Sequence, residues 1–256
     1  MHNKKRKICV ITGTRAEYGL LQPIMQVIKD DPVFELQVVA TGMHLSPEFG
    51  LTYKTIEKDG FKINEKIEML LSSDTSIGVA KAMGLATISM SEMLDRLKPE
   101  FIMVLGDRFE LLAVTQAALV SRVPVIHLVG GDVTEGAFDE AIRHSITKMS
   151  HLHFVTNKES QKRVRQLGEN PENIFLVGNP GLDHLNNIKL MTKNELEKSL
   201  DYSFRKRNIL VTFHSVTLDE KSSMDSFEEL LIALDSFGDE VGIIFTKPNS
   251  DTEGRK

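Results

Sequence analysis

Residues 101–129 read FIMVLGDRFELLAVTQAALVSRVPVIHLV, and this stretch decides the fold. The apolar runs Phe101–Leu105 and Val125–Val129 are typical of strands buried on both faces, because they lack the polar alternation of a half-exposed strand. Between them, Leu111–Ser121 has the apolar spacing of a helix. A strand, a helix and a second strand in this order predict two parallel strands joined by a right-handed crossover.

The same alternation continues on both sides of this stretch. It predicts a first α/β domain over residues 1–177, and the turn cluster Gly178-Asn179-Pro180-Gly181 marks a hinge after it. Further strands are expected at Ile8–Ile11, Leu36–Ala40 and His153–Thr156, and further helices at Leu20–Lys29, Ile77–Leu97, Glu140–Met149 and Lys158–Leu167.

Residues 178–256 are expected to form only part of a second domain. They predict a helix at Asn194–Leu200, a strand at Ile209–Thr212, a helix at Ser226–Phe237 and a strand at Val241–Phe245. Two strands cannot build a sheet with both faces covered, so we expect an incomplete second domain. The alternative is a small appendage packed on the first domain.

Composition excludes several classes of protein. The chain has 256 residues, a net charge of -5 and 41% hydrophobic residues, as ordinary globular proteins do. The mild acidity argues against a nucleic-acid partner, and no apolar run is long enough to span a membrane. The one cysteine, Cys9, rules out an internal disulfide framework. With no secretory signal at its basic start, we expect a cytoplasmic protein without a membrane partner.

Two clusters of polar residues follow the strands of the opening stretch. Ligands of open α/β sheets bind outside the carboxyl ends of the strands. Asp107 and Arg108 follow the end of the first strand, and the tract from His127 to His153 starts at the end of the second. Asp107 is placed either to cap the next helix or to take part in chemistry, and the adjacent arginine favours chemistry. Gly130 and Gly131 permit close approach of the backbone to a ligand.

The tract after the glycines is rich in acids. Carboxyl groups such as Asp132 and Asp139 acquire different pKa values when they converge in a cleft, which suits one acid and one base. The alternative is that Asp139 only begins a helix, where acids suit the helix dipole. His151 and His153 would share one face of a strand, but no third ligand accompanies them, so we predict no metal site.

Three further positions are candidates for ligand contacts. Arg15 follows the first strand and the Thr12-Gly13-Thr14 turn, where its guanidinium and a helix N-terminus suit an anion; a plain turn is the alternative. His214 and Asn249 each follow a strand of the second domain and either face the cleft or lie in water-exposed loops.

Taken together, these motifs resemble the hydrolysing UDP-N-acetylglucosamine 2-epimerases of sialic and legionaminic acid pathways. Few of the motifs are specific singly, but their order and spacing are, and they run through essentially the whole chain. They are Gly13-Thr-Arg-Ala-Glu-Tyr18, Gly42-Met-His-Leu45, Leu97-Lys-Pro99, Gly106-Asp-Arg-Phe-Glu110, Gly130-Gly-Asp132, Asp139-Glu-Ala-Ile-Arg-His144, Ile146-Thr-Lys148, Ser150-His-Leu-His153, Gly178-Asn-Pro180 and Phe213-His214.

The resemblance implies a fold and a reaction. The fold is the glycosyltransferase-B type, in which two Rossmann-like domains face each other. The substrate is a UDP-sugar, either UDP-N-acetylglucosamine or UDP-2,4-diacetamido-2,4,6-trideoxyglucose. The proton at C2 is removed, UDP leaves by anti elimination, and water adds to the resulting glycal to give the free manno-configured sugar. No cofactor or metal is implied, and the full-length form is expected to be a homo-oligomer.

The resemblance also implies residue roles. Asp107 and Asp139 match family carboxylates assigned to acid/base work, and His214 matches a second-domain histidine. Arg15 and Arg108 match residues that line the UDP-sugar cleft. His44, Gly130, Gly131 and Asn249 are expected to contact the substrate.

The chain departs from the family pattern at Val129, where many members carry a glutamate. Either Asp132 takes over that role, or the chain belongs to a branch of the family with a different substrate. The alternatives to an epimerase are a non-catalytic or inactive UDP-sugar-binding fragment and a glycosyltransferase of the same architecture. Family members also continue past Lys256, with a segment that holds the nucleotide.

Overall fold

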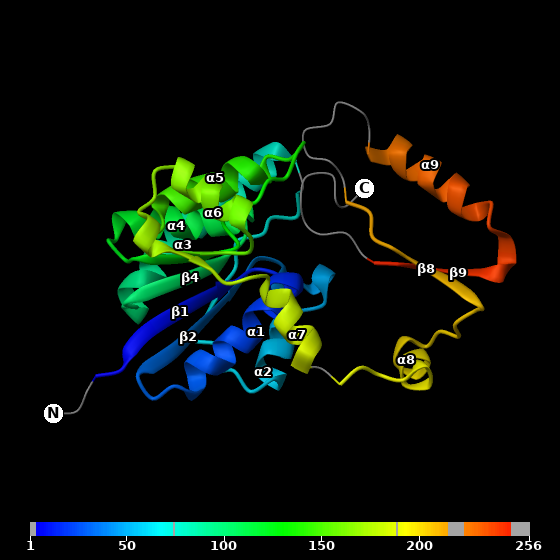
Figure 1. The fold of residues 1–256 in the computed structure, drawn as a ribbon, viewed down its shortest axis with the longest axis horizontal. Coiled ribbons are helices and arrows are strands. Elements are labelled where there is room, and N and C mark those ends of the chain that lie inside the picture. The colour runs from blue at the N-terminus through cyan, green and yellow to red at the C-terminus, as the bar shows by residue number, and fades with distance from the viewer. Residues whose placement is uncertain (1–3, 74, 188, 215–222, 247–256) are drawn as a thin grey trace. The chain divides into compact units, whose positions relative to one another are not determined.

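The structure is a computed structural model that describes residues 4–73, 75–187, 189–214 and 223–246 (Figure 1). The chain divides into two compact units, Met1–Asn186 and Asn187–Lys256, which are described separately. Among the helices of the described part of the chain, none combines the length and hydrophobicity that crossing a membrane requires.

The first unit is built on a seven-stranded parallel sheet with the order β3-β2-β1-β4-β5-β6-β7. The chain adds strands on one side of β1 and then on the other, so the order reverses between β1 and β4. At such a reversal the loops that follow the two strands separate and leave a crevice at the carboxyl edge. The strands are β1 (Arg6–Thr12), β2 (Phe34–Thr41), β3 (Glu65–Ile67), β4 (Phe101–Leu105), β5 (Val125–Leu128), β6 (Leu152–Val155) and β7 (Ile174–Leu176).

Helices cover both faces of this sheet (Figure 1). One face carries α1 (Arg15–Asp30) and α2 (Tyr53–Lys58), and the other carries α3 (Ser76–Leu97), α4 (Phe109–Val120) and α5 (Asp139–Met149). α6 (Lys158–Gln166) packs through Val164 against Val155 and Ile174. α7 (Pro180–Asn187) ends the first unit.

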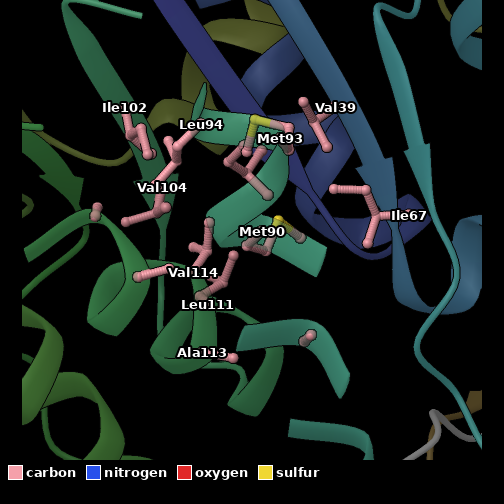
Figure 2. Close-up of a cluster of buried hydrophobic side chains, with 14 of the residues drawn as sticks. Val39, Ile67, Met90, Met93, Leu94, Ile102, Val104, Leu111, Ala113 and Val114 are labelled. Atoms are coloured by element: carbon pink, nitrogen blue, oxygen red, sulfur yellow. The ribbon is translucent and has the colours of Figure 1, made fainter. Parts of the chain in front are cut away.

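The larger hydrophobic core lies between the sheet and α3 and α4 (Figure 2). Met90 and Met93 of α3 and Leu111 of α4 are completely buried there, against Ile102 and Val104 of β4. Burial of each such side chain stabilises the fold by about 1.5–3 kcal/mol. This rigid layer fixes the end of β4 and the start of α4, which is where the Gly106–Arg108 loop lies.

The expected α/β class with parallel strands is confirmed. The strand predicted at Phe101–Leu105 has those bounds in the structure, and the other predicted elements of the first unit differ only at their ends. The sequence prediction omitted β3, β7, α2 and α7, which are all short. The first unit runs through Asn186, whereas the predicted boundary lies between residues 177 and 178.

The second unit contains a two-stranded parallel sheet among its described residues. Thr192 and Glu195 form a capping box at the start of its first helix. Leu210 and Ile232 are 67% and 72% exposed, so apolar surface of this unit remains uncovered. Its elements are α8 (Lys193–Leu200), β8 (Arg207–Val211), α9 (Ser223–Asp235) and β9 (Val241–Phe245), close to the predicted ones.

Candidate active site

The carboxyl edge of the first sheet carries most of the predicted site residues. Gly13–Arg15 follow β1, Gly106–Arg108 follow β4, and Val129–Asp132 follow β5. β1 and β4 are the two strands at which the sheet order reverses. The topology therefore brings these loops to the position where open α/β sheets bind ligands.

Asp107 is held by a buried arginine. Arg143 of α5 forms an ion pair with Asp107, and their side chains are 9% and 22% exposed. The same guanidinium donates to the Asp132 carbonyl oxygen at 2.8 Å and to the Thr134 hydroxyl at 2.9 Å. One cation thus joins the loop after β4 to the loop before α5 and gives the Asp107 carboxylate a fixed position and a countercharge.

Asp139 is brought to the same edge by α5. It is the first residue of that helix and lies four residues before Arg143, so the two side chains lie on the same helix face. Asp139 is partly exposed. The arrangement supplies two carboxyl groups near one arginine, as an acid/base site requires.

His127 of β5 supports the loop that carries Asp107 through a hydrogen bond to its backbone. Its ring is fully buried, its Nε2 donates to the Gly106 carbonyl oxygen at 2.8 Å, and its Nδ1 lies 3.2 Å from the Thr147 hydroxyl. Burial lowers the pKa of His127 to about 4, so the ring is neutral at physiological pH. A neutral histidine beneath Gly106 fixes the backbone that presents Asp107.

Gly130 and Gly131 are required by internal packing. A Cβ atom at Gly130 would lie 2.9 Å from His127 Nδ1, and one at Gly131 would lie 2.5 Å from the Ser160 carbonyl oxygen. Gly131 also has a φ of 83°, which L-residues rarely adopt. Both glycines therefore let the loop after β5 sit against β5 and α6.

The Asp132 carboxylate is directed at the start of α6. It accepts hydrogen bonds from Thr156 at 3.2 Å, from Asn157 at 3.3 Å and from Ser160. These contacts hold the glycine loop on α6, while the backbone of Asp132 contacts Arg143.

Val129 has a strained backbone. Its φ is 63°, and a β-branched side chain is disfavoured in this left-handed region. Its N–H donates to the Phe154 carbonyl oxygen at 2.8 Å, and its side chain packs against the core on the α1 side of the sheet. Strain of this kind is concentrated at functional sites.

Four polar side chains surround the turn after β1. Arg108 Nε lies 2.7 Å from Glu110 Oε1, and Glu17 accepts a hydrogen bond from the Gly13 N–H at 2.8 Å. His44 is fully buried and contacts the hydroxyls of Thr12 at 3.0 Å and Thr52 at 2.8 Å. Burial lowers the pKa of His44 to about 4. Arg15, in contrast, is exposed at the first position of α1.

Comparison with known proteins identifies the family. The profile of the family described as UDP-N-acetylglucosamine 2-epimerase matches residues 26–256. The chain belongs to this family. It is 44% identical to the GDP/UDP-N,N'-diacetylbacillosamine 2-epimerase (hydrolyzing) of Campylobacter jejuni, an alignment that covers 98% of this chain and 65% of the relative.

A second relative and a solved structure support the same family and fold. The chain is 37% identical to polysialic acid biosynthesis protein P7 of Escherichia coli, over 96% of this chain and 63% of that protein. The UDP-GlcNAc 2-epimerase of Methanocaldococcus jannaschii, solved with UDP-GlcNAc and UDP, superimposes with a TM-score of 0.79 at 22% identity, over 94% of this chain and 65% of that one. This epimerase-family chain therefore has the glycosyltransferase-B-type fold of its relatives, and it spans about two thirds of their length, between 63% and 65%.

The remaining predicted residues of this family member belong to the second unit. His214 follows β8 by three residues and is exposed, while Asn249 lies outside the described residues. No cluster of three or more histidine, cysteine, aspartate or glutamate side chains suited to a metal occurs within the described ranges.

The residues that sequence reasoning missed in this family member are the supporting ones. Arg143, Glu17 and Glu110 were quoted only inside motifs, and His127 had no assigned role. Thr14 and Glu17 have the Thr-x-x-Glu spacing of a capping box, which was a usable signal. In the structure Thr14 accepts from the Glu17 N–H, but the Glu17 carboxyl bonds to Gly13.

Proposed function

We propose that this chain provides the proton-transfer site of a hydrolysing UDP-sugar 2-epimerase. The observation that carries the proposal is the Asp107–Arg143 ion pair at the strand-order reversal, with Asp139 one helical turn away on the same face of α5. A partly buried, oriented carboxylate near a second carboxyl group suits removal of a weakly acidic C–H proton.

The reaction needs proton transfer on both faces of the sugar. One carboxylate takes the C2 proton, the C1–O bond breaks, and UDP departs and leaves a C1=C2 double bond. Water then adds its hydroxyl to C1, and a proton is delivered to C2 from the opposite face. We assign these two transfers to Asp107 and Asp139, and we propose a further catalytic role for His214 of the second unit.

Positive charge must stabilise the departing diphosphate. Arg15 is the first residue of α1, which follows β1, and Arg108 lies on the loop after β4, so their charges and the positive end of the α1 dipole are proposed to stabilise the diphosphate. Gly130, Gly131 and Asn249 are proposed to contact the sugar or the nucleotide, and His44 to support the turn that carries Arg15. Asp132, bound to α6, is proposed to hold the glycine loop; its proton-transfer role stays a prediction.

For the substrate we propose a UDP-2,4-diacetamido-2,4,6-trideoxy sugar. Relatives at 44% and 35% identity are named N,N'-diacetylbacillosamine 2-epimerases, whereas one named UDP-N-acetylglucosamine 2-epimerase is 31% identical. A cytoplasmic location and a homo-oligomeric full-length form also stay predictions.

The test is a turnover assay with both nucleotide sugars. We expect UDP release, faster with the diacetamido substrate, and its loss in Asp107→Asn with the fold retained. Asp95→Asn, an exposed substitution on α3, is the matched control and should keep wild-type turnover. No UDP from either substrate with folded protein would refute the proposal for this chain.

A non-catalytic UDP-sugar binder is the second candidate. The apolar Val129, at a position where many members of the family carry a glutamate, favours it. Calorimetry with UDP, combined with the turnover assay, separates the two functions. A non-catalytic binder binds UDP in the calorimeter but releases no UDP from a UDP-sugar in the assay. Val129→Glu tests the departure from the family pattern directly. A large gain in turnover would show that the chain lacks a catalytic carboxyl group at this position.

A further inference from the structure

Two buried glutamates lie against the turn after β1 and have no part in the proposed reaction. Glu17 of α1 is 5% exposed and Glu110 of α4 is 1% exposed. Glu17 Oε2 accepts the Gly13 N–H at 2.8 Å, and a Cβ atom on Gly13 would overlap Glu110 Oε1 and lie 3.0 Å from its Cγ. Both carboxyl groups therefore contact the same glycine, at the reversal of the sheet order.

The charges around this glycine do not support two carboxylates. Arg108 is bonded to Glu110, with 2.7 Å between Nε and Oε1. Two further basic side chains belong to this region of the described chain: burial keeps His44 neutral by lowering its pKa to about 4, and Arg15 is exposed. A second buried carboxylate would be strongly disfavoured in this setting. Consistent with this, burial and the nearby Glu110 raise the pKa of Glu17 to about 8, against the opposing hydrogen bonds from Gly13 and Thr14 and the charge of Arg108.

Each of the two glutamates has one buried carboxyl oxygen that makes no hydrogen bond to a described residue. Glu17 Oε1 and Glu110 Oε2 are both fully buried and make no hydrogen bond to any described residue. A protonated carboxyl group needs an acceptor for its O–H, and a buried carboxylate oxygen needs a donor. A proton on Glu17, with Glu110 ionised, would remove one of the two buried charges at this turn.

We propose that Glu17 and Glu110 share a proton across the Gly13 turn and act as positioning residues. The shared proton joins α1 to α4 at the point where β1 and β4 end. Arg108 is held directly through Glu110, and Arg15 indirectly through the turn that precedes α1. The consequence for ligand binding rests on the proposed function, in which these two arginines stabilise the diphosphate.

Infrared spectroscopy tests the shared proton without any ligand. We expect the carbonyl-stretch band of a protonated carboxyl group in the folded chain at pH 7, lost in Glu17→Gln. Glu100→Gln, which removes an exposed glutamate bonded to Arg6, is the matched control and should keep the band. Absence of the band in the folded wild type, or its survival in Glu17→Gln, would overturn the proposal.

Binding of UDP, followed by calorimetry, tests the positioning role. Glu17→Gln retains one donor and one acceptor, so its affinity for UDP should stay within about twofold of wild type, whereas Glu17→Leu should weaken it about tenfold. Wild-type affinity should also fall as the pH rises through 8, and that of Glu17→Gln should not.

The outcomes separate the two proposals. Equal losses in Glu17→Gln and Glu17→Leu, or a flat pH profile in the wild type, would show that an ionised glutamate or mere packing is responsible and would overturn the positioning role. If the wild type does not bind UDP, the proposed function fails, while the infrared result still decides whether the proton is shared.

Discussion

Replacing Arg143 by methionine tests the ion pair that supports the candidate site. Methionine keeps an unbranched apolar stem of similar reach but removes the charge and every donor. In the wild type the guanidinium bonds to Asp107, to the Asp132 carbonyl oxygen and to the Thr134 hydroxyl. The substitution therefore removes the Arg143 bond of one carboxylate and of two neutral acceptors.

The expected cost follows from the burial of the partners. Removing one member of a buried ion pair costs about 3–5 kcal/mol. Asp107 is 22% exposed, so water solvates part of the orphaned charge and the lower end of that range applies. Adding about 0.5 kcal/mol for each lost neutral hydrogen bond gives a loss of about 4 kcal/mol for Arg143→Met. Asp107→Asn should cost about 3 kcal/mol, because it removes the countercharge of the more buried Arg143, and the double variant about 4 kcal/mol, because the second substitution removes the charge that the first one left without its ion-pair partner.

Hydrogen exchange is the suitable assay, because the chain has two units that need not unfold together. The measured quantity is the free energy of opening for the amides of α5. Arg96→Met is the matched control: Arg96 pairs with Glu65 on the surface, so the loss should be below about 1 kcal/mol. If the losses in Asp107→Asn and Arg143→Met add within about 0.5 kcal/mol in the double variant, the two side chains are not coupled and the reasoning is wrong.

Three further predictions concern stability. Gly131→Ala should lose about 2–4 kcal/mol, because its φ is 83° and the new Cβ would lie 2.5 Å from the Ser160 carbonyl oxygen, whereas Gly84→Ala, in open space on α3, should gain about 1 kcal/mol; thermal unfolding measures both. Lys98→Gly should raise stability by about 0.5–1 kcal/mol, because Lys98 ends α3 with a φ of 47°; an unchanged melting temperature would contradict this. His127 has a folded-state pKa of about 4 against an ordinary 6.5, so the unfolded chain binds more protons and stability falls as the pH drops from 6.5 to 4, by up to about 3 kcal/mol. His127→Gln should flatten that part of the profile of melting temperature against pH.

The sequence predicted the elements whose burial is continuous. β4 was located residue for residue because all five of its side chains are apolar, which is the pattern of a strand covered on both faces. β3 and β7 have three residues each, which is too short for any periodicity to appear. β5 ends one residue before its predicted end because Val129 adopts a left-handed backbone, which no property of valine predicts.

The candidate site was predictable only in part. Asp107 and Asp139 could be selected as candidates because each follows the end of a strand or begins a helix, whereas their acid/base roles were implied by the family resemblance and stay predictions. Arg143 could not, because an arginine on an amphipathic helix is normally solvated; its burial depends on Asp107, which lies 36 residues away in the chain. The same holds for Glu17 and Glu110, which meet only because β1 and β4 are neighbours in the sheet.

The left-handed backbone at Val129 has a consequence for how this position can diversify. Its conformation is imposed by the hydrogen bond to Phe154 and by the glycine loop that follows, and not by the valine. A β-branched residue such as valine bears a large conformational penalty in this region, whereas asparagine and aspartate bear a smaller one. The side chain at position 129 can therefore change while the turn that presents it keeps its backbone conformation.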